Sequence, residues 1–469
     1  MIYSSLAVLH GLLASIVTGH VLLNKQDVRS AAAWIGLAWL SPFLGAAVYF
    51  ALGINRVARR ASRINRDTGP AFNYPQTPPF DGAALAENIR TTAEVGGRLT
   101  GLPLTGGNSI EMFRSGDEAY PAMLAAIAGA RRSIALASYI FRPDRVGADF
   151  VEALIAAKAR GVEIRVLVDG IGSGYFSSPV IRRLHRAGID ATRFMHDWRP
   201  WRMSFINLRN HKKLMIIDGT HGFAGGLNLG VENIFTRRRE REVDDLHFRL
   251  EGPVVNQLMA SFAEDWHFTT GDSVTGSAWW PAIETAGSVI TRVISSGPDE
   301  DIGKIETVLA TAIGQAKHYI RIVTPYFLPD ERLRSAIGLA ALRGVEIDLA
   351  IPERSDHAVM DWAMHAHLAF FPLDRIRCYL TPGPFDHSKL MTVDGQWCAI
   401  GSPNWDVRSL RLNFELLLEC YDEETVARLD STIDEKISQA RMLTPDDLTG
   451  RPLAARLRDA SARMLLPYL

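Results

Sequence analysis

Two long apolar runs open the chain, and short segments of helical and strand periodicity alternate through the rest. The first run covers residues 2–23, and the second, at 31–53, contains no charged residue. As a helix, either run would be about long enough to cross the roughly 30 Å hydrocarbon core of a bilayer. We therefore predict a hairpin of two transmembrane helices, and the second is the stronger candidate because His10 and His20 interrupt the first. A secretory signal peptide is the alternative for the first run, but no basic residue precedes Lys25.

Basic residues are unevenly distributed around the predicted hairpin. Its turn contains only Lys25 and Arg29. By the positive-inside rule, the larger number of arginines after the hairpin places everything beyond residue 54 in the cytoplasm. The same arginines could instead bind anionic lipid headgroups. They are Arg56, Arg59, Arg60, Arg63 and Arg66.

The segments that follow predict a linker and then an α/β fold. Prolines without apolar periodicity lie between Asp67 and Asp81, as is typical of a linker. From about Gly101 onward, helical spacing alternates with strand-like runs, which indicates an α/β layer with parallel strand pairing. The first such elements are helices at 117–130 and 148–160 and strands at 133–141 and 162–168.

The order of these elements occurs twice. Arg160-Gly-Val-Glu-Ile returns as Arg343-Gly-Val-Glu-Ile, and Tyr139-Ile-Phe has a counterpart in Tyr326-Phe-Leu. We infer two similar α/β/α lobes, each a mixed sheet flanked by helices, related by a pseudo-two-fold axis. An amphipathic C-terminal tail predicts a helix that packs on the lobes or lies on a membrane. The predicted divisions are the hairpin and basic flank (1–60), a linker (61–100), the first lobe (101–272), a second linker (273–288), the second lobe (289–425) and the helical tail (426–469).

Composition limits the possible partners. At 469 residues, with 47% hydrophobic and 22% charged residues, the chain is long and apolar enough for several folded domains. Its formal net charge of -1 provides no general basic field for nucleic acid, so an anionic partner must meet local clusters. Cys378, Cys398 and Cys420 have no CxxC spacing and fit free thiols in a reducing compartment.

The clearest part of the repeat consists of residues that could take part in catalysis. Each copy contains a His-x-Lys, an Asp-Gly five residues after the lysine, and an asparagine at one shared distance from the histidine. A histidine and a lysine two apart on a strand point to the same face, so two copies brought together would make one site. The members are His211, Lys213, Asp218 and Asn228 in the first copy and His387, Lys389, Asp394 and Asn404 in the second.

These residue types suit phosphoryl transfer without a metal. Lysine and asparagine side chains would bind the non-bridging oxygens of a phosphate. One neutral histidine could attack phosphorus while the other, protonated, gives its proton to the leaving alcohol. The Asp-Gly pairs predict hairpin turns. His365 and His367 could suggest a metal pair, but no partner stands at ligand spacing, so we expect no metal and no other cofactor.

The motifs resemble the paired HKD motifs of the phospholipase D superfamily, and over nearly the whole chain the sequence resembles the bacterial cardiolipin synthases within it. The pattern includes Gly225-Gly226-x-Asn228 in one copy and Gly401-Ser402-x-Asn404-x-Asp406-x-Arg408-Ser409 in the other. The resemblance implies that His211 is the nucleophile and His387 the general acid and base. It also implies that phosphate is bound by Lys213, Lys389, Asn228 and Asn404, with Asp218 and Asp394 completing the motifs.

Further roles follow from the same resemblance. Ser402 would add a hydroxyl contact to phosphate in one half only, because Gly226 stands in its place in the other. A carboxylate beyond each motif would orient a histidine and fix its tautomer. Glu415 fits this role in the second half, and in the first half we prefer Asp245 to Asp244.

The predicted function is that of a phosphatidyltransferase in the bacterial inner membrane, multi-pass, with cytoplasmic lobes, which joins two phosphatidylglycerols into cardiolipin. Expected partners are phosphatidylglycerol, other anionic phospholipids and the membrane, without nucleic acid; the sequence does not indicate an oligomeric state. Hydrolysis of phospholipid or nucleic acid by the same intermediate is the alternative, and an inactive lipid-binding scaffold is a third hypothesis. Basic segments at 198–202 and 237–241 could attract lipid or be ordinary surface loops.

Overall fold

The computed structural model describes residues 2–25, 28–53, 79–174, 176–196, 208–235, 242–297 and 303–464. The chain divides into an N-terminal helical unit and a larger body, and each is described by itself. The predicted basic flank, most of the proline-containing linker and the basic segments at 198–202 and 237–241 lie outside the described residues.

The N-terminal unit corrects the predicted membrane hairpin. Within the described residues, α1 (Ile2–Asn24) is the one helix that is long and apolar enough to cross a membrane. The second predicted span is broken, because α2 (Val28–Leu40) ends before Pro42 and two short helices follow, α3 (Leu44–Val48) and η1 (Tyr49–Gly53). Proline inside a helix removes a backbone hydrogen bond, which accounts for the break. The first run is thus the stronger candidate, and the multi-pass prediction is not supported.

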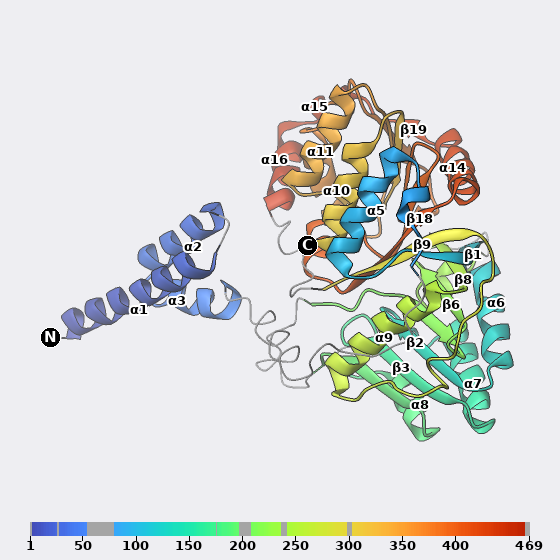
Figure 1. Ribbon diagram of the computed structural model, residues 1–469. Coiled ribbons are helices and arrows are strands. Elements are labelled where there is room, and N and C mark those ends of the chain that lie inside the picture. The colour runs from blue at the N-terminus through green and yellow to red at the C-terminus, as the bar shows by residue number, and fades with distance from the viewer. Residues whose placement is uncertain are drawn as a thin grey trace. The chain divides into compact units, whose positions relative to one another are not determined.

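The two histidines of α1 contribute to packing inside this unit. His20 Nδ1 lies 2.6 Å from the Tyr49 hydroxyl, and His10 Nε2 lies 3.2 Å from the carbonyl oxygen of Trp39. Figure 1 shows α1, α2 and α3 side by side. Their shared apolar cluster contains Ala14, Val17, Val21, Ala38, Ala46 and Tyr49.

The body is built on one mixed sheet whose two halves have corresponding strand orders outward from the centre. Its order is β19-β13-β12-β10-β15-β16-β18-β9-β1-β8-β6-β5-β2-β3-β4. At the centre, β1 (Thr105–Arg114) pairs antiparallel with β9 (Val289–Ser296), and each strand opens one lobe. Outward from this pair, the strands of one lobe correspond one by one to those of the other, apart from the edge strand β19, which has no counterpart. The predicted fold class of two similar α/β lobes with pseudo-two-fold symmetry is confirmed.

Each lobe combines parallel outer strands with antiparallel inner strands, as a mixed sheet requires. The other first-lobe strands are β2 (Ser133–Ser138), β3 (Glu163–Asp169), β4 (Asp190–Phe194), β5 (Leu214–Ile217), β6 (His221–Gly225) and β8 (Leu246–Glu251). Those of the second lobe are β10 (Tyr319–Val323), β12 (Glu346–Pro352), β13 (Arg377–Thr381), β15 (Leu390–Val393), β16 (Trp397–Gly401), β18 (Glu415–Tyr421) and the edge strand β19 (Arg441–Met442).

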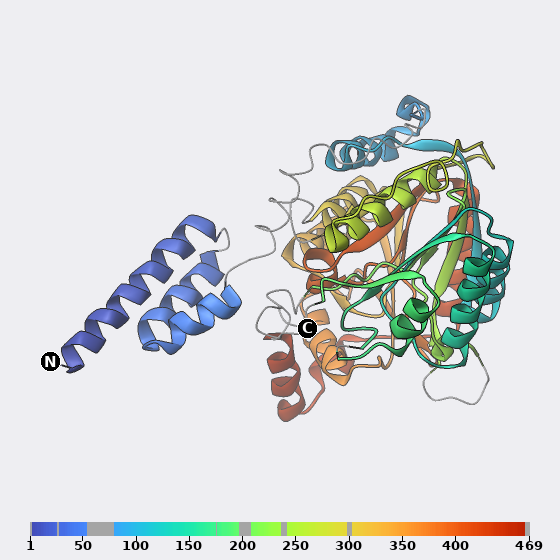
Figure 2. The same cartoon turned by 90° about the horizontal axis from the view of Figure 1, so that it is seen from below.

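Helices cover both faces of the sheet. Figure 2 shows α6 and α7 on one face of the first lobe and α9 on the other. The first-lobe helices are α6 (Ser115–Gly129), α7 (Arg145–Ala159), α8 (Pro179–Arg186) and α9 (Val254–Thr270). The second-lobe helices are α10 (Lys304–Gln315), α11 (Glu331–Leu342), α12 (Ala358–Leu368), α13 (Val407–Arg411) and α14 (Glu423–Ser438), followed by α15 (Pro445–Thr449) and α16 (Leu453–Met464).

The structure differs from the predicted divisions at the ends of the lobes. Part of the predicted linker 61–100 forms η2 (Gly82–Ala84) and α5 (Glu87–Thr100), and Ile89 of α5 belongs to the core of the second lobe. Helix α14, assigned mostly to the tail, packs on the second-lobe sheet. The tail helix α16 packs on α12, where Arg458 lies 4.5 Å from the ring centre of Trp362. Of the two predicted positions for the tail, packing on a lobe is the one observed.

Candidate active site

Each HKD segment is fixed by backbone bonds to the opposite lobe. The His211 N–H donates to the carbonyl oxygen of Phe414 over 2.9 Å, and the His387 N–H donates to that of Asp244 over 2.7 Å. The second contact continues a two-stranded sheet of β7 (Val243–Asp244) and β14 (Phe385–Asp386). The two histidines therefore meet where the lobes join.

His211 is oriented by a carboxylate from the second lobe. Its Nδ1 lies 3.0 Å from Glu415 Oε2, and Glu415 is fully buried. The same carboxylate accepts hydrogen bonds from Ser402, Ser409 and Asn413. Although burial opposes ionisation, His211 is the main group that holds the pKa of Glu415 below its ordinary value. Burial, opposed by Glu415, lowers the pKa of His211.

His387 is oriented by a carboxylate from the first lobe. Its Nδ1 lies 2.7 Å from Asp245 Oδ2 and also 2.7 Å from Lys389 Nζ. Burial raises the pKa of Asp245, while burial and the adjacent Lys389 and Lys213 lower the pKa of His387 well below its ordinary value. An imidazole that donates Nδ1–H to Asp245 keeps Nε2 available for a substrate.

The carboxylates are crossed between the lobes. The sequence predicted that Glu415 and Asp245 orient histidines without indicating which, and in the structure each contacts the histidine of the other half. Gly226 and Ser402 differ for a related reason. A side chain at Gly226 would overlap both carboxylate oxygens of Asp245, so glycine makes room for the shorter acid. Ser402 instead donates to Glu415 over 2.5 Å. Its hydroxyl therefore points to the carboxylate, whereas the sequence predicted a contact with phosphate.

Both lysines lie beside the histidines, with their ammonium groups bound to backbone. Lys213 Nζ donates to the carbonyl oxygen of His211 over 2.7 Å, and Lys389 makes the same contact with His387. Burial lowers the pKa of Lys213 to about 7, and burial also lowers the pKa of Lys389. A phosphate placed against the histidines would reverse part of this effect, because a nearby anion favours the charged ammonium.

The asparagines of the motifs line the cavity, and the motif aspartates do not. Asn228 and Asn404 are on the cavity wall, and among the described residues Asn404 Oδ1 is buried without a hydrogen-bond partner. Asp218 and Asp394 were included with the catalytic motifs, but each accepts three consecutive backbone N–H groups at the start of a strand, β2 or β10. Their own backbones have φ values of 54° and 52° in hairpin turns. These bonds hold the turns that the Asp-Gly pairs predicted.

The cavity between the lobes has a volume of about 670 Å³. His211 and His387 form part of its wall together with the tyrosines of the repeat, and the Tyr139 ring lies edge-on to His211 at 4.8 Å. Motif analysis did not select these tyrosines or the charged wall residues as site residues, although the recurrence of Tyr139 and Tyr326 was a usable signal. The other charged and polar wall residues are Arg142, Arg209, Asp356, His357, Asp406, Arg408 and Asn413.

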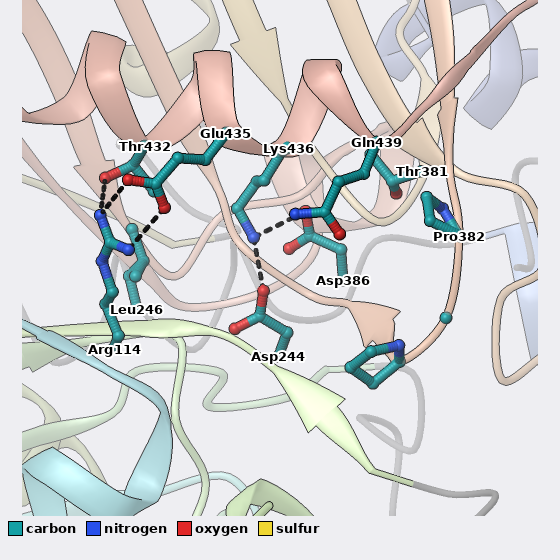
Figure 3. Close-up of a pocket in the computed structure, with 12 residues that line it drawn as sticks. Arg114, Asp244, Leu246, Thr381, Pro382, Asp386, Thr432, Glu435, Lys436 and Gln439 are labelled. Atoms are coloured by element: carbon teal, nitrogen blue, oxygen red, sulfur yellow. Dashed lines mark hydrogen bonds and ion pairs between the residues drawn. The ribbon is translucent and has the colours of Figure 1, made fainter.

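A second, smaller pocket lies behind the His387 segment. Figure 3 shows Lys436 of α14 pointing between Asp244 and Asp386. Lys436 Nζ lies 2.6 Å from Asp244 and 3.0 Å from Asp386. This clamp joins Asp244 and Asp386, the residues that precede Asp245 and His387.

His365 and His367, considered above as a possible metal pair, have structural surroundings. His365 Nδ1 lies 2.6 Å from the carbonyl oxygen of Asp361 in α12, and burial lowers the pKa of His367 to about 4. In the part of the chain that the structure describes, no group of three or more His, Cys, Asp or Glu residues could hold a metal ion.

Two crossed histidine–carboxylate pairs facing one cavity, in a duplicated α/β fold, define a phospholipase D-type phosphotransfer enzyme. The family model for cardiolipin synthase with a PLD-like domain matches residues 123–266 and 309–437. The chain belongs to this family.

Curated relatives extend the match to nearly the whole chain. The major cardiolipin synthase ClsA of Bacillus subtilis is 30% identical over 98% of both chains. A cardiolipin synthase of Oceanobacillus iheyensis is 29% identical over 96% of this chain and 95% of its own length. Cardiolipin synthases are membrane-associated, which agrees with the apolar helix α1.

Two solved structures of other enzymes have a similar fold. Phosphatidylserine synthase of Haemophilus influenzae superposes with a TM-score of 0.64 at 14% identity, over 81% of this chain and all of that one. Polyphosphate kinase of Porphyromonas gingivalis superposes with a TM-score of 0.51 at 15% identity, over 76% of this chain and 52% of that one. The two-lobed arrangement thus occurs in other enzymes of phosphate chemistry.

Proposed function

We propose that this protein transfers the phosphatidyl group of one phosphatidylglycerol to a second, producing cardiolipin and glycerol. The observation that carries the proposal is the pair of imidazoles, each held by a buried carboxylate of the opposite lobe, on the wall of one cavity. Membership of the cardiolipin synthase family supports this reaction over other phosphoryl transfers.

In the first step, His211 Nε2 attacks phosphorus and forms a P–N bond, and the P–O bond to the glycerol headgroup breaks. His387 gives its proton to the departing glycerol oxygen. In the second step, His387 takes the proton of a hydroxyl on the incoming phosphatidylglycerol. That oxygen forms a new P–O bond, and the P–N bond to His211 breaks. Atoms and protons balance over the cycle without a redox step.

The assignment of His211 as nucleophile is supported by the state of its carboxylate. The phosphatidyl-imidazolium carries positive charge, and an ionised carboxylate stabilises it. Glu415 has a lowered pKa and is fixed by three further donors, whereas burial raises the pKa of Asp245. The low pKa of His387 makes it a strong acid once the substrate's negative charge has favoured its protonation.

We include the membrane arrangement in the proposal. Helix α1 would attach the chain to the bacterial inner membrane, with the catalytic body on the cytoplasmic side. The arginines that follow the apolar segments support this orientation. Both lipid substrates would then come from one leaflet.

The test uses membranes that contain the full-length chain and phosphatidylglycerol labelled in its headgroup glycerol. We expect cardiolipin and free glycerol in equal amounts, and neither product with a His211→Ala/His387→Ala double variant. Phosphatidic acid as the sole lipid product would overturn the synthase proposal in favour of hydrolysis. Addition of phosphatidylethanolamine should release no ethanolamine; its release would identify a different donor.

A further inference from the structure

The cavity wall departs from the pseudo-symmetry of the lobes at several positions, and Arg209 and Arg408 occupy two of them. Arg209 stands two residues before His211, and the matching position before His387 is Phe385. Arg408 stands four residues after Asn404, and the matching position after Asn228 is Glu232. The repeat conserves its histidines, lysines and asparagines, but at each of these two positions only one copy has an arginine.

These two arginines lie together although they come from different lobes. Both line the cavity that contains the histidine pair. The carbonyl oxygen of Arg209 accepts a hydrogen bond from Phe414 N–H, and that of Arg408 accepts one from the neighbouring Asn413 N–H. One short segment thus holds both backbones. Burial, and then the charge of Arg209, lowers the pKa of Arg408, as expected for two close cations in a partly enclosed space.

The acids near these arginines have other partners. Asp169 accepts backbone hydrogen bonds from Ile171, Gly172 and Asn210 N–H. Asp406 accepts one from Ser409 N–H, and burial raises its pKa to about 6. Tyr139 lines the same cavity, where burial raises its pKa and the charges of Arg209 and Arg408 oppose this rise. A guanidinium has five N–H donors in a planar fork that fits phosphate oxygens, so a contact with one neighbour does not exhaust its capacity.

We propose that Arg209 and Arg408 form a second anion subsite, which binds the phosphodiester of the acceptor phospholipid while the histidine pair holds the reacting phosphorus. This inference rests on the proposed function and adds to it the reason why a lipid is the acceptor. Phosphatidylglycerol carries its own phosphate close to its reacting hydroxyl, whereas water and free glycerol carry none. A cationic subsite on one side of the histidines favours the anionic acceptor and orients its hydroxyl toward the P–N bond.

The test compares two acceptors with one donor. Cardiolipin formation uses the anionic acceptor, and exchange of labelled free glycerol into phosphatidylglycerol uses an uncharged one. For Arg209→Gln and Arg408→Gln, we expect the ratio of cardiolipin formation to glycerol exchange to fall about 10- to 100-fold, as for loss of a charge-assisted contact to phosphate. Arg408→Lys keeps the charge and should recover part of the ratio.

Arg142→Gln is the matched control. Arg142 lines the same cavity but is paired with Glu232 over 3.2 Å and is half exposed, so the ratio should stay within about twofold of the wild type. An unchanged ratio in both the Arg209 and the Arg408 variant would overturn the subsite. Equal loss of both reactions would also overturn it, provided that the thermal midpoint of the variant matches that of the wild type. If the glutamine variants do not fold, the same criterion applies to Arg408→Lys. Glycerol exchange without cardiolipin in the wild type would instead refute the proposed function, and the subsite with it.

Discussion

The two halves of the active site contain the same histidine, lysine and asparagine but support them differently. Glu415 reaches His211 with a buried carboxylate that Ser402 and two other side chains also bond. Asp245 reaches His387 with a shorter side chain, over a glycine, and shares it with Lys389. The Glu415 carboxylate is stabilised in its charged form, because its pKa is lowered. Burial raises the pKa of Asp245, which both His387 and Lys389 contact. This difference suits a nucleophile whose adduct is cationic and an acid that must release its proton.

The largest expected effect comes from removing either histidine. His211→Ala and His387→Ala should each lower cardiolipin formation by at least about 10⁴-fold, by analogy with loss of a nucleophile or its partner in a catalytic triad. The halves are distinguished by a donor whose leaving group is p-nitrophenol, which needs no proton to depart. With this donor, His387→Ala should still form the covalent lipid–enzyme adduct, whereas His211→Ala should not. Adduct formation by His211→Ala would reverse the assignment.

The carboxylates provide the second test of the comparison. Glu415→Gln should lower turnover by about 10²- to 10³-fold and Asp245→Asn by about 10- to 10²-fold, because only the first stabilises the cationic adduct. The adduct of the Glu415 variant should accumulate less in rapid-quench experiments. Equal losses in the two variants would mean that the halves are functionally equivalent.

The glycine–serine difference offers matched controls for these carboxylates. In Gly226→Ala, the new side chain would displace the Asp245 carboxylate, so activity should fall about as far as in Asp245→Asn. Ser402→Ala removes one of several donors to Glu415 and should cost less than tenfold. A larger loss for Ser402→Ala would support the phosphate contact that the sequence suggested.

Buried lysines next to each motif allow a third test, on stability. Lys212 is bound to Asp265 of α9 over 2.9 Å, and both side chains are almost fully buried. Lys436 of α14 makes the corresponding clamp to Asp386, with part of Asp244 exposed (Figure 3). Breaking a buried pair costs about 3–5 kcal/mol, so Lys212→Met should lower the thermal midpoint more than Lys436→Met. The clamp adjoins His387 and Asp245. For each degree by which the thermal midpoint falls, Lys436→Met should therefore lose more activity than Lys212→Met. Equal ratios of activity loss to stability loss would contradict this difference.

The sequence predicted the features that occur in both copies of the repeat and missed those that do not. Matching spacing identified the histidines, lysines and asparagines, and alternating elements identified the lobes. The crossed contacts of Glu415 and Asp245 depend on which strands of opposite lobes meet, at Phe414 and at β7 with β14, and no local pattern encodes that pairing. Arg209 and Arg408 each occur in one copy only, so the symmetry of the repeat assigned them no role, although Arg408 lies within the motif that contains Asn404.

A similar limit applies to the apolar N-terminus. Hydropathy treats 31–53 as one span, whereas Pro42 divides it into separate helices. Hydropathy also counts His10 and His20 against the first run, although both are bonded within the helical unit. Composition measures the length of an apolar run, but backbone geometry and partners decide whether the run is one helix.

The smallest expected effect is a pH dependence that belongs to one half of the site. The pKa of Lys213 is about 7 without substrate, and a bound anion raises it. Anion affinity should therefore be constant below pH 7 and weaken as the pH rises above 7, because the neutral amine must then gain a proton on binding. Competitive inhibition by sulfate, whose charge is constant over this range, measures the effect. Lys213→Arg cannot lose its proton and should remove the inflection near pH 7, whereas an inflection that persists in this variant would assign the titration to another group, such as Lys389.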